Sequence, residues 1–137
     1  SSYLGEGYLQ AYNQFGERTL FLGTGSSGGG YLRTYNFDGQ ETVYVGTGAD
    51  SSGQMRIYDS AGETGTFIGS GYFRTYNQFG KMSTFLGNGR DGGGYLRTNN
   101  KFETETAFLG TNNSNEGLVN LNDKFGQSFW IRLNKGD

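Results

Sequence analysis

The stretch "GYLRTYNFDGQETVYVG" at residues 30–46 decides the fold of this chain. It reads as a strand, a tight turn that includes Asn36 and Gly39, and a second strand. The asparagine side chain can hydrogen-bond the turn backbone. The glycine three residues later supplies the positive φ that a three-residue hairpin loop with a bulge requires. The stretch therefore predicts a β-hairpin.

The same phrase recurs along the whole chain. Six units align without internal gaps, and they begin at Tyr8, Tyr31, Gln54, Tyr72, Tyr95 and Leu118. The first and second units resemble the fourth and fifth, at a separation of 64 residues, whereas the third and sixth share an aspartate at the turn. The sequence therefore predicts an all-β fold of six tandem hairpins in two triplets of about 64 residues. Such a chain is expected to form an elongated, oligomeric β-prism, β-solenoid or β-helix-like fold.

These units define one predicted β-repeat domain over residues 1–137. Its repeats are 8–30, 31–53, 54–71, 72–94, 95–117 and 118–137. Residues 1–7 remain as an N-terminal half-hairpin, because "YLG" at 3–5 matches "FLG" at 21–23, the second strand of a unit. We expect that unpaired strand to seek a partner. The candidate strand-exchange segment is Ser1, Ser2, Tyr3, Leu4 and Gly5.

One turn departs from the pattern. Five units have glycine at the position that needs positive φ, and the fifth has Glu103. A residue with a Cβ tolerates that backbone conformation poorly. The sequence therefore predicts a strained or altered turn in the fifth unit.

Composition excludes several classes of function. The 137 residues include 26 glycines but no cysteine, proline or histidine, so disulfides, thiolate or imidazole metal sites and histidine-based catalysis are ruled out. The formal charge of −2 does not favour nucleic acid as a partner. No apolar run is long enough for a membrane helix. Repetition also argues against an enzyme, because catalysis needs one differentiated site.

The glycine-rich connectors suggest no cofactor. A phosphate loop needs a strand that leads into a helix, and no segment has helical periodicity. "GNGRDGGG" at 87–94 is faintly similar to calcium-binding repeat turns, but each connector carries at most one aspartate. We therefore predict no cofactor and no metal.

Strand alternation divides the hairpins into two faces. If Asn13 pairs with Glu17, Leu9 lies opposite Phe21 and Tyr8 lies opposite Leu22. The face with Leu9 and Phe21 is then the expected dry core. The opposite face is the candidate assembly or ligand face, and its residues are Tyr8, Tyr12, Tyr31, Arg33, Tyr35, Arg56, Tyr58, Tyr72, Arg74, Tyr76, Tyr95 and Arg97.

This tyrosine and arginine face allows three interpretations. Arginine can lie between tyrosine rings as a purely structural arrangement. The same side chains can stack on sugar rings, as in a multivalent lectin. They can also form a tyrosine-rich contact between copies of the chain. The aliphatic column expected beside the arginines favours burial, and hence the contact between copies.

The phrase G-Y-L-x-x-Y-N-x-x-G, followed by a short aromatic strand that ends in F-L-G, resembles the tandem hairpin repeats of fibrous β-proteins. Phage tail fibres, trimeric bacterial adhesins and extracellular filaments are of this type. The resemblance implies a homo-oligomer, as a trimer or filament, at the extracellular or cell or virion surface after any leader is removed, with no cofactor. The function expected is that of a structural, non-enzymatic, self-assembling subunit. The alternative is a carbohydrate-binding or adhesin module whose partners are glycans.

Overall fold

The computed structural model describes residues 1–5 and 7–133, and these residues form antiparallel strands and no helix. The all-β prediction is therefore confirmed. The chain divides into two compact units, residues 1–70 and 71–137. The first unit contains β1 (Ser2–Gly5), β2 (Tyr8–Tyr12), β3 (Arg18–Thr24), β4 (Gly30–Tyr35), β5 (Glu41–Thr47), β6 (Gly53–Tyr58) and β7 (Thr64–Gly69). The second contains β8 (Tyr72–Tyr76), β9 (Met82–Asn88), β10 (Gly94–Asn99), β11 (Glu105–Thr111), β12 (Gly117–Asn122) and β13 (Ser128–Leu133).

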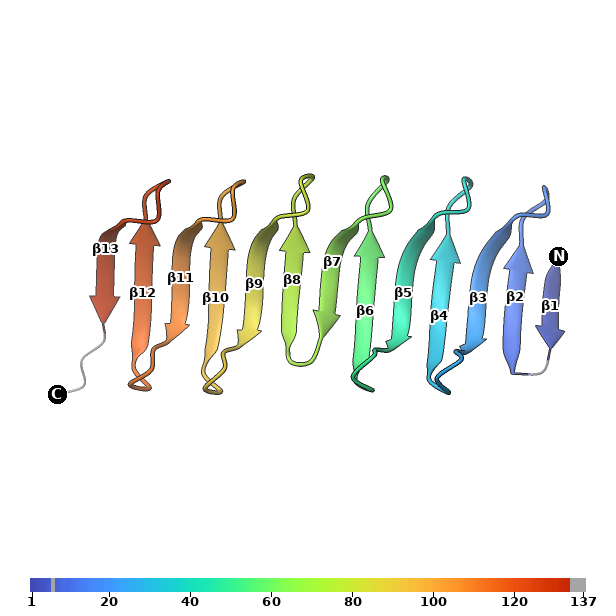
Figure 1. The fold of residues 1–137 in the computed structure, drawn as a ribbon, viewed down its shortest axis with the longest axis horizontal. Coiled ribbons are helices and arrows are strands. Elements are labelled where there is room, and N and C mark those ends of the chain that lie inside the picture. Colours follow the sequence, from blue (N-terminus) through green and yellow to red (C-terminus); the bar gives the residue numbers. More distant parts are fainter. Residues whose placement is uncertain (6, 134–137) are drawn as a thin grey trace. The chain divides into compact units, whose positions relative to one another are not determined.

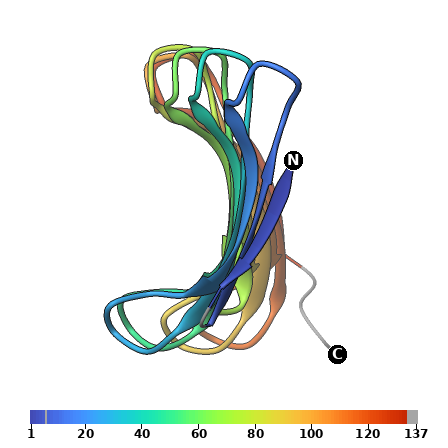
Figure 2. The same ribbon diagram turned by 90° about the vertical axis from the view of Figure 1, so that its right-hand side faces the viewer.

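Each unit is a one-layer antiparallel meander. Its strands lie side by side in chain order (Figure 1), and among the described residues each strand contacts only the strands next to it in the chain. The strands of the first unit curve along their length (Figure 2). Within neither unit do the first and last strands pair, so neither sheet closes on itself.

The predicted turn is present in the first hairpin. The Asn13 backbone N–H donates to the Glu17 carbonyl at 2.9 Å, and the Asn13 Oδ1 accepts from the backbone N–H groups of Phe15 and Glu17 at 2.9 and 3.0 Å. Gly16 has a φ of 85°, the left-handed conformation that favours glycine. The turns of the other five hairpin repeats close in the same way, through Asn36, Asp59, Asn77, Asn100 and Asp123.

Glu103 occupies the left-handed position of its turn with a φ of 69°. Its backbone N–H still donates to the Asn100 carbonyl at 3.0 Å, so the turn geometry is retained. The predicted backbone strain at this position is therefore present, and the turn itself is not altered. The Glu103 carboxylate accepts a hydrogen bond from the Met82 N–H at 3.3 Å and lies 3.9 Å from the Lys81 Nζ.

The connectors at the other end of the strands are also tight hairpins. In the first one, the Gly25 N–H donates to the Gly29 carbonyl at 2.8 Å and the Gly28 N–H to the Gly25 carbonyl at 2.9 Å. This is the hydrogen-bond pattern of the Asn13 turn. Ser51 and Asn115 take the left-handed place of Gly28 in two further connectors, with φ of 64° and 63°.

The predicted register was wrong beyond the turn. Asn13 does pair with Glu17, but the ladder shifts between Ala11 and Tyr12 and leaves Thr19 as the extra residue of a β-bulge. Leu9 therefore pairs with Leu22, and not with Phe21. Because a shift of one residue moves every following side chain to the other face, the second strand of each bulged hairpin is inverted relative to the prediction.

The expected dry core is also corrected. The Leu9 face gathers aliphatic side chains from both strands of each hairpin, and it is exposed: Leu22, Val45 and Ile68 expose 47%, 43% and 44% of their surface. Among the described residues, Phe85 alone is buried, with 5% exposed. A one-layer sheet has no second layer to exclude water from both faces, which explains the absence of a core.

Candidate functional surfaces

The aromatic side chains of the first unit form a ladder across the strands. The centroid distances between successive rings are 5.6 Å for Tyr3 and Tyr8, 5.7 Å for Tyr8 and Phe21, 5.1 Å for Phe21 and Tyr31, and 5.7 Å for Tyr31 and Tyr44. The last three pairs are stacked, and such pairs contribute about 0.5 to 1.5 kcal/mol beyond the apolar area that they bury. The aromatic ladder therefore stabilises neighbouring strands without a second layer.

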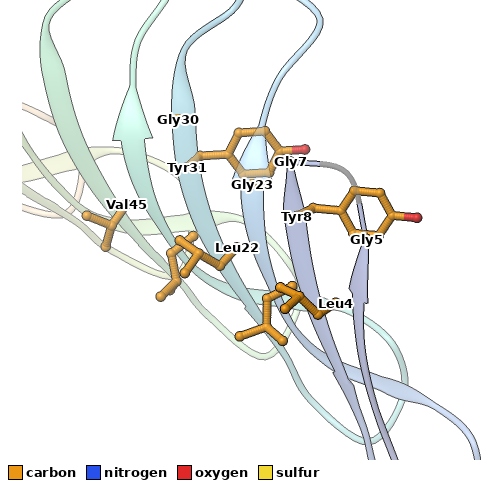
Figure 3. A pocket seen from close by; sticks show the side chains of 11 residues that line it. Leu4, Gly5, Gly7, Tyr8, Leu22, Gly23, Gly30, Tyr31 and Val45 are labelled. Carbon is orange, nitrogen blue, oxygen red and sulfur yellow. The ribbon is translucent and has the colours of Figure 1, made fainter.

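Glycine makes the ladder possible. Tyr8 pairs across the strands with Gly23, where the absent side chain leaves room for the Tyr8 Cβ and for the Phe21 ring. The Tyr8 ring points toward Gly5 of β1 (Figure 3). A Cβ on Gly23 would lie 2.6 Å from the Tyr8 Cβ and 2.9 Å from the Phe21 ring. Gly46 is even tighter, with 2.4 Å to the Tyr31 Cβ. The glycine that ends each F-L-G or Y-V-G strand is thus a packing requirement.

The second unit has a ladder of the same kind. Phe85 lies between Tyr72 and Tyr95 at centroid distances of 5.6 and 4.7 Å, and Tyr95 stacks on Phe108 at 5.2 Å. Rings on both sides of Phe85 explain why it is buried although no other layer covers it.

The arginines of the predicted face lie over these rings. The Arg33 Cζ is 4.7 Å from the Tyr31 centroid, and the Arg74 Cζ is 4.3 Å from the Tyr72 centroid. The Nε atoms of Arg56, Arg74 and Arg97 are buried without a hydrogen-bond partner. Their stems therefore cover the ladder, and the guanidinium groups make cation–π contacts.

Arg33 also pairs with Glu41, whose Oε2 is 3.3 Å from the Arg33 Nε. Desolvation alone would lower the pKa of Arg33, but the charge of Glu41 and a hydrogen bond with Tyr35 act against it, and the pKa is raised overall. For Tyr58, desolvation acts in the other direction and raises the pKa. Glu41 raises this pKa further, while Arg56 opposes the shift. These groups form one polar cluster on β4, β5 and β6.

The structure places the candidate residues of the first unit on one face, as alternation along each strand predicted. The outer tyrosines are part of that face: the Arg18 Cζ lies 4.5 Å from the Tyr35 centroid, and the Tyr12 hydroxyl donates to Gln10. In the second unit, Tyr72, Arg74 and Tyr76 share the corresponding face of β8. Sequence reasoning missed the phenylalanines between the tyrosines, because the bulge brings them to this face.

The opposite face of β2 to β7 carries no charged side chain. Its two inner rows contain Leu9, Leu22, Leu32, Val45, Met55 and Ile68, then Ala11, Leu20, Thr34, Val43, Ile57 and Thr66. We call this set the aliphatic face. Leu4, which is 81% exposed, borders an open depression of about 580 Å³ together with Leu22 and Val45 (Figure 3).

The candidate strand-exchange segment forms β1, which pairs with β2 of the same chain. Ser1 exchanges both backbone hydrogen bonds with Tyr12, at 2.7 and 3.1 Å. Since bonded residues alternate in an antiparallel pair, Ser2 and Leu4 direct their N–H and C=O groups away from β2. Among the described residues, no strand of the first unit pairs with that edge.

Exposed phenylalanines at the turns of both units were also missed. Phe15, Phe79, Phe102 and Phe125 precede the left-handed residue of their turns, and Phe37 lies nearby in the second turn. They expose between 63% and 73% of their surface. The Nζ atoms of Lys101 and Lys124 each lie 4.9 Å from the centroid of the next phenylalanine. The recurrence of phenylalanine in five of the six turn phrases was the available signal.

Neither a comparison with protein-family models nor one with curated protein sequences finds a match for this chain. The resemblance to fibrous β-repeats therefore stays a prediction. Within residues 1–5 and 7–133, no helix is long and apolar enough to cross a membrane. The same residues contain no group of three or more Asp or Glu side chains placed to hold a metal ion.

Proposed function

We propose that this chain is a structural, non-enzymatic β-repeat subunit that associates with copies of itself in an extracellular fibre or filament. The observation that supports the proposal is the exposed aliphatic face. A contiguous apolar surface of this kind usually marks an interaction site. In this proposal, copies supply the layers of an elongated β-prism or β-solenoid, as a trimer or a filament.

The chemistry of the aliphatic face favours a second copy as its partner. A surface with no charge or amide across six strands is best covered by another surface of the same kind, because a polar partner would lose hydration without gaining hydrogen bonds. Six strands about 4.8 Å apart and two rows about 7 Å apart give a footprint of roughly 350 Å². A stable interface buries about 800 Å² per partner. The aliphatic face of the first unit alone is therefore too small, and association is expected to need a further contact.

The tyrosine and arginine face is less suited to this contact than the sequence suggested. Its rings already stack on one another, and its arginines already lie over them. The free edge of β1 offers a second contact, since Ser2 and Leu4 can pair with a strand of another copy.

The mass of the particle in solution tests the proposal. We expect the wild-type chain to form oligomers, and the double variant Leu22→Gln, Val45→Thr to shift toward monomers with an unchanged far-UV circular dichroism spectrum. Gln10→Thr, on the opposite face of β2, is the matched control and should keep the oligomer. A wild-type chain that stays monomeric at all concentrations would contradict the proposal.

Glycan binding is the second candidate function. One observation favours it at a single place: a polar hollow beside Tyr44, where the aromatic ladder is interrupted.

A further inference from the structure

The aromatic ladder lacks one ring in the first unit. The repeat position occupied by Tyr8 in β2 and Tyr31 in β4 is occupied by Gln54 in β6. Gln54 pairs with Gly46 and with Gly69, as Tyr31 pairs with Gly23 and Gly46, so the backbone leaves the same room above it. The ring that would stack next to Tyr44 is therefore absent.

A hollow of about 260 Å³ lies at this place, lined by Tyr44, Gln54, Arg56, Tyr58, Arg33 and Glu41 among others. It is smaller than the roughly 300 to 1,000 Å³ of pockets for drug-sized ligands, so it suits a single ring. The Tyr44 hydroxyl donates to the Thr47 carbonyl at 2.7 Å, which holds the ring in place before any ligand arrives.

Arg56 differs from its equivalents in the same way. Arg33 and Arg74 each lie over the tyrosine two residues earlier in the strand, at 4.7 and 4.3 Å. The corresponding residue for Arg56 is Gln54, which has no ring. Arg33 pairs with Glu41, but no carboxylate of the described residues lies within salt-bridge distance of Arg56. The Arg56 guanidinium therefore lacks the tyrosine and the acid that Arg33 has, and its ring contact is with Phe67, whose centroid lies 5.7 Å from the Arg56 Cζ.

We propose that this hollow binds one acidic sugar residue, a pyranose that carries a carboxylate, in the place of the missing tyrosine ring. The apolar C–H face of the pyranose stacks on Tyr44. Its carboxylate pairs with the Arg56 guanidinium in the bidentate geometry typical of arginine. Its hydroxyl groups hydrogen-bond Gln54 and Tyr58. Glu41 does not repel the ligand strongly, because Arg33 neutralises it at 3.3 Å.

The polar lining favours a sugar over a plain aromatic ligand. Besides Tyr44, the hollow presents an amide, a phenol, a carboxylate and two guanidinium groups, and a hydrocarbon ring would offer none of them a hydrogen bond. Because no carboxylate of the described residues pairs with Arg56, an acidic sugar is favoured over a neutral one.

Titration of the ¹⁵N-labelled chain with methyl β-D-glucuronide, followed by NMR, tests the proposal. A single sugar is expected to bind weakly, with saturable shifts at millimolar concentration for the amides around Tyr44, Gln54 and Arg56. Methyl β-D-glucoside and 4-hydroxyphenylacetate are the neutral and aromatic controls, and both should bind at least tenfold more weakly. Equal binding of either control, or no saturable shift with the glucuronide, would overturn the assignment.

Gln54→Tyr is the decisive variant, because it completes the ladder and fills the hollow. It should abolish glucuronide binding while the protein unfolds at a higher temperature than the wild type, so that loss of binding does not reflect loss of fold. Gln54→Asn keeps the hollow open and should retain binding. Binding that persists in Gln54→Tyr would contradict the proposed place. None of these substitutions lies on the aliphatic face. The outcome of the sugar-binding test is therefore independent of the outcome of the oligomer test.

Discussion

The two faces of the first unit differ in how far their own side chains shield them from water. On one face, rings long enough to reach the neighbouring strand stack over glycines, and arginine stems cover them. On the other face, the aliphatic side chains are shorter and leave nearly half of the central row exposed at Leu22, Val45 and Ile68. In a one-layer sheet, stacked rings and arginine stems can thus shield the aromatic face from water. The aliphatic face stays exposed unless a partner covers it.

The largest effect is expected at the glycines under the rings. Gly46→Ala places a Cβ 2.4 Å from the Tyr31 Cβ and 2.7 Å from the Gly30 carbonyl oxygen, and neither atom can move without shifting the strand. We expect a loss of about 3 kcal/mol in the free energy of unfolding, measured by urea denaturation. Gly53→Ala is the matched control, since a Cβ there meets nothing within 4 Å, and it should change stability by less than about 1 kcal/mol. Equal losses in the two variants would show that ring packing does not require the glycine.

Adjacent residues of β9 allow a direct comparison of the faces in the second unit. Phe85 stacks between two tyrosines and is 5% exposed, whereas Leu86 is 53% exposed. Phe85→Leu should cost about 2 kcal/mol, because it removes both stacking contacts and part of the buried area. Leu86→Ala should cost about 1 kcal/mol or less when measured at a protein concentration below that at which copies associate. If Leu86→Ala were the more destabilising change, the face of β9 that carries Leu86 would have to be covered within the monomer.

The sequence predicted the hairpins and the residues of the tyrosine and arginine face, because turns and alternation are local. Asn13, Gly16 and Glu17 are close in sequence, and their hydrogen bonds follow from residue type. The register was not predictable in this way. A bulge adds one residue, Thr19, whose type is common in regular strands, and this single residue decides which face receives Phe21.

The hollow at Gln54 could have been found from the alignment of repeats, since glutamine replaces tyrosine there. That this glutamine leaves a gap in the aromatic ladder could not be inferred, because the ladder exists only in the bulged register. Exposure could not be predicted either, because alternation shows that two faces differ and does not show whether a second layer covers one of them.

The smallest predicted effect uses the one chemical property that the aliphatic face lacks entirely, a titratable side chain. Desolvation, and then Glu41, raises the pKa of Tyr58 on the opposite face. Both the folded and the unfolded chain carry a neutral Tyr58 near pH 8. Between the ordinary pKa of about 10 and the higher folded value, the unfolded chain loses its proton first, so stability falls as the pH rises. Tyr58→Phe should therefore lose less stability than the wild type between about pH 8 and pH 10.5 in urea denaturation. An identical decline in the two proteins would mean that Tyr58 ionises in the folded state as it does in the unfolded chain, and that the cluster around Glu41 and Arg56 does not hold it.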